Sequence, residues 1–374
     1  MSQYGGLGGL GGLGGLGGLG GLGGLGGLGG LGGTNFTGLG GFLGAEDPGG
    51  YDPVTTYGLQ TTAEGLRHLT EEGTTPTDKE LGFSDPANLG GLATWVRGSL
   101  YVSEFLAGIG SDAMVGTGGA PDRVALSFDG GTCLTLDRPD PALLQSQCRF
   151  VSDYATLRAE RSAEITSQLG FPTPYFAMIL GLHSAQNKKT FELITATQVA
   201  AAHTAMIVKQ HLAIRRPDQL DPRLMPMIPT PGHGSFPSAH ATEAYAVLTV
   251  LEALVTAWDS LGQLEQRKKA LRGLAERITV NRTVAGVHYP IDSWAGAALG
   301  RIVGQVVLAR AGAATCVGAL AYTPGDHDFF DEDQRDPAIA PSKGLTITGD
   351  MVTLDAKPAF SWLWSGAVAE AQKA

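Results

Sequence analysis

Cysteine is scarce in this chain. The 374 residues include only three cysteines, Cys133, Cys148 and Cys316, and none has a CxxC or zinc-type spacing. This pattern defines neither a metal site nor a disulfide framework. A single bridge between Cys133 and Cys148 is compatible with the sequence, which does not decide whether it forms.

Positive charge is also in short supply. The chain has 26 Lys and Arg against 36 Asp and Glu, a formal net charge of -10. This balance argues against nucleic acid or an anionic membrane as the main partner, because both attract basic surfaces. We therefore expect a small-molecule substrate, and basic residues that cluster nonetheless need a local reason.

Long uninterrupted apolar runs are missing as well. The N-terminus has no basic segment followed by an apolar one, and the most apolar helical stretches are interrupted by Glu252 or Arg301. We expect a soluble protein with no membrane span and no visible Sec signal. It would be cytoplasmic by default, and export by a non-Sec route is the open alternative.

Glycine, in contrast, is abundant: the chain has 56, and residues 5–33 form a near-perfect Gly-Gly-Leu repeat without proline. A period of three fits neither an α-helix nor a strand, but it fits polyproline II, where all leucines share one edge. The absence of proline disfavours collagen. We expect residues 5–33 to build a homo-oligomer or filament, with a flexible low-complexity tail as the alternative.

Composition divides the chain into four parts. Residues 1–33 are the repeat tail, residues 34–55 are a Gly/Pro/Asp-rich linker, residues 56–320 are a helical domain, and residues 321–374 are an irregular C-terminal extension. Helical periodicity predicts five helices, at about 150–169, 190–213, 238–258, 262–280 and 292–311.

The predicted fold class is therefore all-α, a helical bundle preceded by a polyproline II-like tail. Two weaker β signals accompany it. Residues 124–137 favour a small hairpin, and residues 345–355 favour a short strand pair.

Three short motifs carry the candidate chemistry. The first places Lys209 and Arg216 seven residues apart, immediately before Pro217. On one helix this spacing is two turns, so both cationic groups would reach the same side before the proline ends the helix. Two cations facing the core imply a bound anion.

The second motif is Pro237-Ser238-Ala239-His240, at the start of a long apolar helix. The free N–H groups and the positive dipole end of a helix N-terminus bind oxyanions. The hydroxyl of Ser238 adds a donor, and His240, in the first turn, would face the bound group.

The third motif contains Arg282, His288 and Asp292. An imidazole that attacks phosphorus or ligates a metal needs its second nitrogen held in place. A carboxylate four residues later, on the next helical turn, can hold it.

Each motif alone has an ordinary explanation: a solvated helix face, a helix cap, a structural histidine. Together they specify nine positions in a fixed order, which is far beyond coincidence for average residue usage. These positions are Lys209, Arg216, Pro217, Pro237, Ser238, His240, Arg282, His288 and Asp292.

The pattern resembles the signature of the superfamily that unites vanadium-dependent haloperoxidases, bacterial acid phosphatases and type 2 phosphatidic acid phosphatases. That signature reads K-x6-R-P, then P-S-G-H, then S-R-x5-H-x3-D. Here Ala239 replaces the motif glycine and Asn281 replaces the serine before Arg282. Ala239 keeps its backbone N–H, so oxyanion binding should survive, although its methyl group narrows the pocket.

The resemblance implies a role for each matched residue. His288 would be the nucleophile of a phosphatase or the ligand of vanadate in a peroxidase, and Asp292 would orient it. His240 would be the general acid and base. The oxygens of phosphate or vanadate would be bound by Lys209, Arg216, Arg282, Ser238 and the N–H of Ala239.

Within this superfamily the sequence narrowly favours a vanadium haloperoxidase, with vanadate as cofactor and hydrogen peroxide oxidising bromide or iodide. His233 precedes Ser238 by five residues, where relatives resembling bromoperoxidases carry a histidine. Lying behind the residues that contact the bound group, it would tune the vanadate or halide chemistry. A histidine in a simple turn is the alternative. The long soluble region before the first motif points the same way.

Two other functions stay open. One is an acid phosphatase that acts through a phosphohistidine and needs no cofactor, and the other is a structural filament subunit assembled through the tail. A membrane lipid phosphatase is disfavoured, because no helix looks long and apolar enough to span a bilayer.

Overall fold

The computed structural model describes residues 53–68, 82, 84–115, 121–258 and 262–373. The Gly-Gly-Leu repeat at residues 5–33, and the predicted linker up to residue 52, lie outside the described residues.

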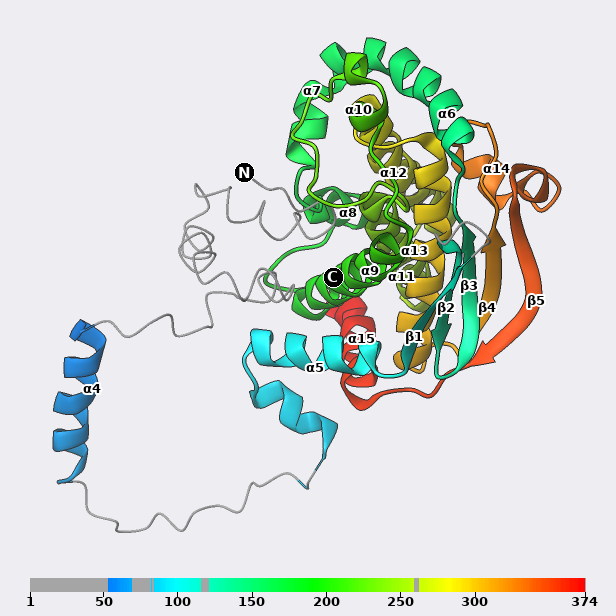
Figure 1. Cartoon of the computed structure of the whole chain (residues 1–374). Coiled ribbons are helices and arrows are strands. Elements are labelled where there is room, and N and C mark those ends of the chain that lie inside the picture. Colours follow the sequence, from blue (N-terminus) through cyan, green and yellow to red (C-terminus); the bar gives the residue numbers. More distant parts are fainter. Residues whose placement is uncertain (1–52, 69–81, 83, 116–120, 259–261, 374) are drawn as a thin grey trace.

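Helices make up most of the described chain (Figure 1). They are α4 (Pro53–Leu66), α5 (Thr94–Leu106), α6 (Pro141–Tyr154), α7 (Arg158–Ser167), α8 (Thr173–Leu180), α9 (Lys188–Leu212), α10 (Pro217–Leu220), α11 (Ala239–Ala257), α12 (Leu264–Val284), α13 (Pro290–Arg310), α14 (Asp331–Arg335) and α15 (Pro358–Ala369).

The prediction of an all-α fold is wrong, because the chain also forms a five-stranded mixed sheet. The strands lie in the order β1-β2-β3-β4-β5, and all neighbours are antiparallel except β3 and β4. Their bounds are β1 Ile109–Val115, β2 Pro121–Phe128, β3 Gly131–Asp137, β4 Cys316–Tyr322 and β5 Leu345–Thr353. Figure 1 shows this sheet along one side of the long helices.

The hairpin predicted at residues 124–137 is confirmed as β2 and β3. Phe128 pairs with Gly131, and both residues of the turn, Asp129 and Gly130, have positive φ. An Asp-Gly pair suits such a turn, because both residues tolerate this conformation. The strand pair predicted near residues 345–355 is instead the single strand β5, which pairs with β4.

The helix predicted at about 150–169 is two helices. α6 already begins at Pro141, where the side chain of Asp140 accepts a hydrogen bond from the N–H of Leu143 at 2.8 Å. A short 3-10 turn at Ala155–Leu157 then separates α6 from α7. The four later helices begin and end within a few residues of their predicted bounds, because their apolar periodicity is long and regular.

Close packing between α11 and α13 forms the centre of the molecule. Gly296, Gly300 and Gly304 lie four residues apart and face α11. A Cβ on Gly300 would come within 2.5 Å of the carbonyl oxygen of Thr242. These glycines therefore let the two helices approach closely, and the N-terminus of α11 comes to lie beside that of α13.

By length and composition alone, the described residues contain one stretch able to cross a membrane, Lys188–Leu220. From the sequence we expected no such stretch. Of its most apolar window, 72% is buried inside the fold, as in the core helix of a globular domain. Cys133, Cys148 and Cys316 are all free thiols, so the bridge considered between the first two is not formed.

Candidate active site

His288 lies at the centre of one half of the site, fixed at both ring nitrogens. Its Nδ1 lies 2.8 Å from Oδ2 of Asp292, and its Nε2 lies 3.0 Å from Nη1 of Arg216. A carboxylate oxygen can only accept, so the ring proton sits on Nδ1. The lone pair therefore lies on Nε2, directed at the guanidinium of Arg216.

The carboxylate of Asp292 is held by the first turn of α13. Pro290 begins the helix, and Oδ2 of Asp292 accepts from the backbone N–H of Tyr289 at 3.0 Å. The hydroxyl of Ser235 donates to the same oxygen. The dipole at this helix N-terminus also favours a negative charge. Asp292 is thus fixed independently of the imidazole that it orients.

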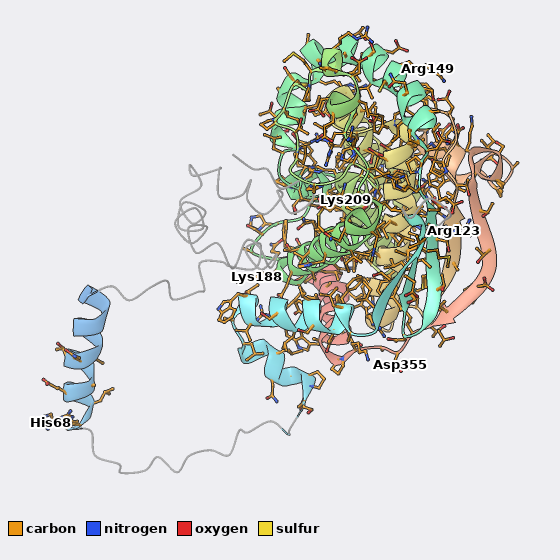
Figure 2. All side chains as sticks on the ribbon, in the orientation of Figure 1. His68, Arg123, Arg149, Lys188, Lys209 and Asp355 are labelled. Carbon is orange, nitrogen blue, oxygen red and sulfur yellow. The ribbon has the colours of Figure 1, made fainter. Side chains whose placement is uncertain are left out.

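Lys209 and Arg216 reach the site from different segments, not from one helix as the spacing suggested. Lys209 is in the last turn of α9, but Ala213 adopts a left-handed conformation that ends the helix. Arg216 follows in an extended conformation before α10. Figure 2 shows Lys209 in the interior among the long helices.

Both cations also hold the loop that precedes α11. Nζ of Lys209 donates to the carbonyl oxygens of Gly234 and Ser235 at 2.7 and 2.8 Å. Nε of Arg216 donates to the carbonyl oxygen of His233 at 3.1 Å. Nδ1 of His233 lies 3.2 Å from Nη2 of Arg216. His233 therefore contacts Arg216, the cation beside Nε2 of His288, and does not contact His288 itself.

His240 and Arg282 form the second half of the site, around Gln168. Nε2 of His240 lies 2.9 Å from the carbonyl oxygen of Gln168, and Nη2 of Arg282 donates to Oε1 of the same residue at 3.1 Å. Because a carbonyl only accepts, Nε2 of His240 carries the proton. Nδ1 is then the nitrogen that can exchange a proton with a bound group.

Ser238 begins α11. Its hydroxyl accepts a weak hydrogen bond from the N–H of Ala241 at 3.4 Å, and its own N–H donates to the carbonyl oxygen of Asp292 at 2.9 Å. Ser238 thus caps α11 and joins it to α13. The next N–H groups, beginning with that of Ala239, have no acceptor within the helix and form the oxyanion-binding end of the dipole.

Burial and positive charge keep both imidazoles neutral in this structure. Burial, followed by the charges of Arg216 and Lys209, lowers the pKa of His288 well below its usual range. Burial and the charge of Arg282 lower the pKa of His240 to about 3. Because the charges of Arg216 and Lys209 also lower the pKa of His240, and the charge of His240 lowers that of His288, the two halves form one electrostatic site.

Positive charge at the site comes first from two guanidinium groups. Burial lowers the pKa values of Arg216 and Arg282 to about 10, so both stay charged at neutral pH. Burial and the charge of Arg216 lower the pKa of Lys209 well below its usual range, whereas burial raises the pKa of Asp292 to about 6 and that of Glu243 well above its usual range. A bound anion would favour the charged form of Lys209, so the site is suited to an oxyanion.

The sequence motifs did not indicate several residues of this site. Ser235 and Gln168 contact the predicted residues only after folding, and no spacing rule marks them. The sequence showed that Asn281 departs from the motif, but it did not show which side chains Asn281 contacts. No group of three or more His, Cys, Asp or Glu side chains within the described ranges is placed to hold a metal ion.

Comparisons with known proteins were made with this geometry in view. Residues 190–316 match the PAP2 superfamily. Over 130 residues the chain is 29% identical to the decaprenylphosphoryl-5-phosphoribose phosphatases of two Mycobacterium tuberculosis strains, CDC 1551 / Oshkosh and ATCC 25618 / H37Rv. The match covers 34% of this chain and 66% of each relative, slightly less than two thirds of their length.

Proposed function

Because residues 190–316 form a PAP2 superfamily domain, we propose that this protein is a phosphatase that hydrolyses phosphate monoesters through a phosphohistidine on His288. The observation that carries the proposal is the fixed tautomer of His288. Its Nδ1–H is held by Asp292 at 2.8 Å, and its Nε2 lone pair lies 3.0 Å from Arg216. The nucleophilic nitrogen of His288 thus lies next to a cation that can bind the oxyanion.

In the first step, Nε2 of His288 attacks phosphorus and the P–O bond to the alcohol breaks. His240, which becomes protonated once the dianionic substrate is bound, gives its Nδ1 proton to the leaving alkoxide, so an alcohol departs. Arg216, Arg282 and Lys209 neutralise the charge on the equatorial oxygens. Asp292 stabilises the positive charge that develops on the His288 ring.

In the second step, water attacks the phosphorus of the phosphohistidine and the P–N bond breaks. Neutral His240 accepts the proton of this water, which restores the acid for the next cycle. The products are inorganic phosphate and free His288. All atoms are balanced without any group beyond the substrate, water and the residues of the site.

One consideration favours the phosphatase over the haloperoxidase that the sequence narrowly favoured: the relatives named above are phosphatases by name. The contact of His233 with Arg216 is compatible with either reaction. Vanadate resembles phosphate in charge and shape, so the same cations suit it. We expect it to act as a competitive inhibitor, with His288 as its ligand.

The test compares both reactions on the full-length protein. We expect hydrolysis of p-nitrophenyl phosphate that orthovanadate inhibits and that His288→Ala abolishes. His211→Ala is the matched control, because His211 lies on α9 and bonds Ser111 outside the site. Bromination of a phenolic dye with vanadate and peroxide, without any phosphate ester hydrolysis, would refute the proposal.

A second assay addresses the substrate. The relatives act, by name, on a decaprenylphosphoryl phosphoribose. A phosphorylated sugar carried on a polyprenyl phosphate should therefore be compared with a water-soluble sugar phosphate. A higher kcat/KM for the lipid-linked ester would extend the resemblance to the substrate, and equal values would restrict it to the phosphate group.

A further inference from the structure

We propose that Gln168 is a positioning residue of this active site, which holds the catalytic acid His240 through its backbone carbonyl and the cation Arg282 through its side-chain amide. This inference rests on the proposed phosphatase function. Gln168 lies outside residues 190–316, the part that matches the superfamily. It is the residue that caps α7, which comes before the matched part of the chain.

Gln168 contacts both the acid and the cation. Gln168 is fully buried and caps the C-terminus of α7. Its backbone oxygen accepts from Nε2 of His240 at 2.9 Å, and its Oε1 accepts from Nη2 of Arg282 at 3.1 Å. A shift of this residue would therefore move the acid and the cation together.

The side-chain amide of Gln168 is fixed in one orientation. Its Nε2 donates to Oε1 of Glu164 at 3.2 Å, and Glu164 also forms a salt bridge with Arg277 at 2.8 Å. Burial alone would raise the pKa of Glu164, but hydrogen bonds from Arg277, Asn281 and Gln168 outweigh it and lower the pKa overall. The carboxylate therefore keeps the amide oxygen turned toward Arg282.

Asn281, which replaces the motif serine, supports the same two side chains. Nδ2 of Asn281 donates to Oε1 of Glu164 at 2.8 Å and to Oε1 of Gln168 at 3.0 Å, while its Oδ1 accepts from Arg161 at 3.2 Å. A serine hydroxyl has one proton and cannot donate to both oxygens. Asn281 thus belongs to the same support as Gln168.

The choice of a neutral amide has a chemical consequence. A carboxylate beside Arg282 would pair with the guanidinium and compete with the substrate oxyanion for it. An amide oxygen orients Arg282 without cancelling its charge, and Nε of Arg282 has no hydrogen-bond partner among the described residues. The remaining donors can therefore be directed at the bound phosphate.

Two substitutions separate these roles. Gln168→Leu removes the acceptor for Arg282 but keeps the backbone carbonyl that holds His240. We expect kcat/KM to fall by about 10- to 100-fold, which is typical for a lost hydrogen bond to a charged group. We expect the pH dependence set by His240 to stay unchanged.

Gln168→Glu instead places a carboxylate beside both groups. It should weaken binding of inorganic phosphate, measured by isothermal titration calorimetry, more than Gln168→Leu does. It should also raise the apparent pKa of His240 in the pH dependence of kcat/KM, because a nearby negative charge favours the protonated imidazole. Asn281→Ser should show a smaller loss of kcat/KM. Gln266→Leu, on the exposed face of α12, is the matched control.

Wild-type values of kcat, KM and phosphate affinity in Gln168→Leu and Gln168→Glu would overturn the inference. If Gln168→Leu does not fold, the phosphate affinity of Gln168→Glu and the apparent pKa of its His240 decide whether the inference holds. If the wild type binds phosphate but hydrolyses no monoester, the proposed function fails. The phosphate affinities of the variants would then still test the positioning of Arg282 by Gln168.

Discussion

At the scale of single residues, the account depends on the tautomer of His288, which Asp292 fixes at 2.8 Å. In Asp292→Asn, an amide replaces the acceptor and no longer stabilises the charge on the ring. We expect kcat to fall on the order of 10² to 10⁴-fold with a smaller change in KM. Steady-state kinetics of the variant beside Asp153→Asn, an exposed aspartate on α6, measures this. An unchanged kcat would remove Asp292 from the mechanism.

The low pKa values of the histidines lead to a prediction about protons. Burial and the cations hold the pKa of His240 at about 3 without a ligand, and a bound dianion opposes the effect of those cations. The pKa must therefore rise on binding, so sulfate, which is already a dianion at this pH and releases no proton of its own, should bind with net proton uptake near pH 6. Calorimetry in buffers of different ionisation enthalpy measures this uptake. Net proton release would contradict the electrostatic description.

The predictability of the site also differs from residue to residue. His288 and Asp292 could be paired from sequence, because four residues on a helix fix their distance. The same reasoning wrongly placed Arg216 on one helix with Lys209, because the left-handed Ala213 ends α9 before Arg216. Gln168 could not be found, because it holds His240 with a backbone carbonyl, which every residue type possesses.

At the scale of elements, the glycines of α13 position α11. A methyl group on Gly300 would come within 2.5 Å of a backbone oxygen of α11, so the helices must separate. We expect Gly300→Ala to lower the free energy of unfolding by about 1–3 kcal/mol, as measured by urea denaturation.

The matched control for Gly300→Ala is Gly273→Ala on α12, where an added methyl group meets nothing within 4 Å. Because alanine favours a helix more than glycine does, this control should gain up to about 1 kcal/mol. A Gly300→Ala variant as stable as this control would mean that the approach of α11 to α13 does not require glycine.

The elements themselves were predictable to different degrees. α9, α11, α12 and α13 show a long helical period, so the sequence placed them within a few residues. The sheet was missed because its central parallel pair joins Leu134 to Leu320, far apart in the chain. Residues 316–322 form a short apolar run without a periodic signal, which local patterns do not distinguish from the end of a helix.

At the scale of the whole molecule, the sheet joins the two ends of the described domain. β2 and β3 come before the motifs, and β4 and β5 follow them. α15 returns to pack against α5 and α9 (Figure 1). The catalytic helices are thus enclosed by segments from both sides of the sequence.

The Gly-Gly-Leu repeat supplies a separate prediction at this scale. If residues 5–33 adopt the polyproline II geometry expected from their sequence, their leucines share one edge, which a single chain cannot bury. We expect removal of residues 1–33 to lower the mass measured by light scattering and to leave phosphatase kcat unchanged. An identical mass for the full-length and shortened chains would end the assembly hypothesis.

The central claim is that His288 becomes covalently phosphorylated, and one measurement tests it directly. The full-length enzyme would be mixed with a monoester carrying radiolabelled phosphate, quenched in alkali within one turnover and digested for mapping. We predict an acid-labile, alkali-stable label on the peptide that contains His288, and none in His288→Ala. Turnover without label at His288, or with label on another residue, would contradict the account.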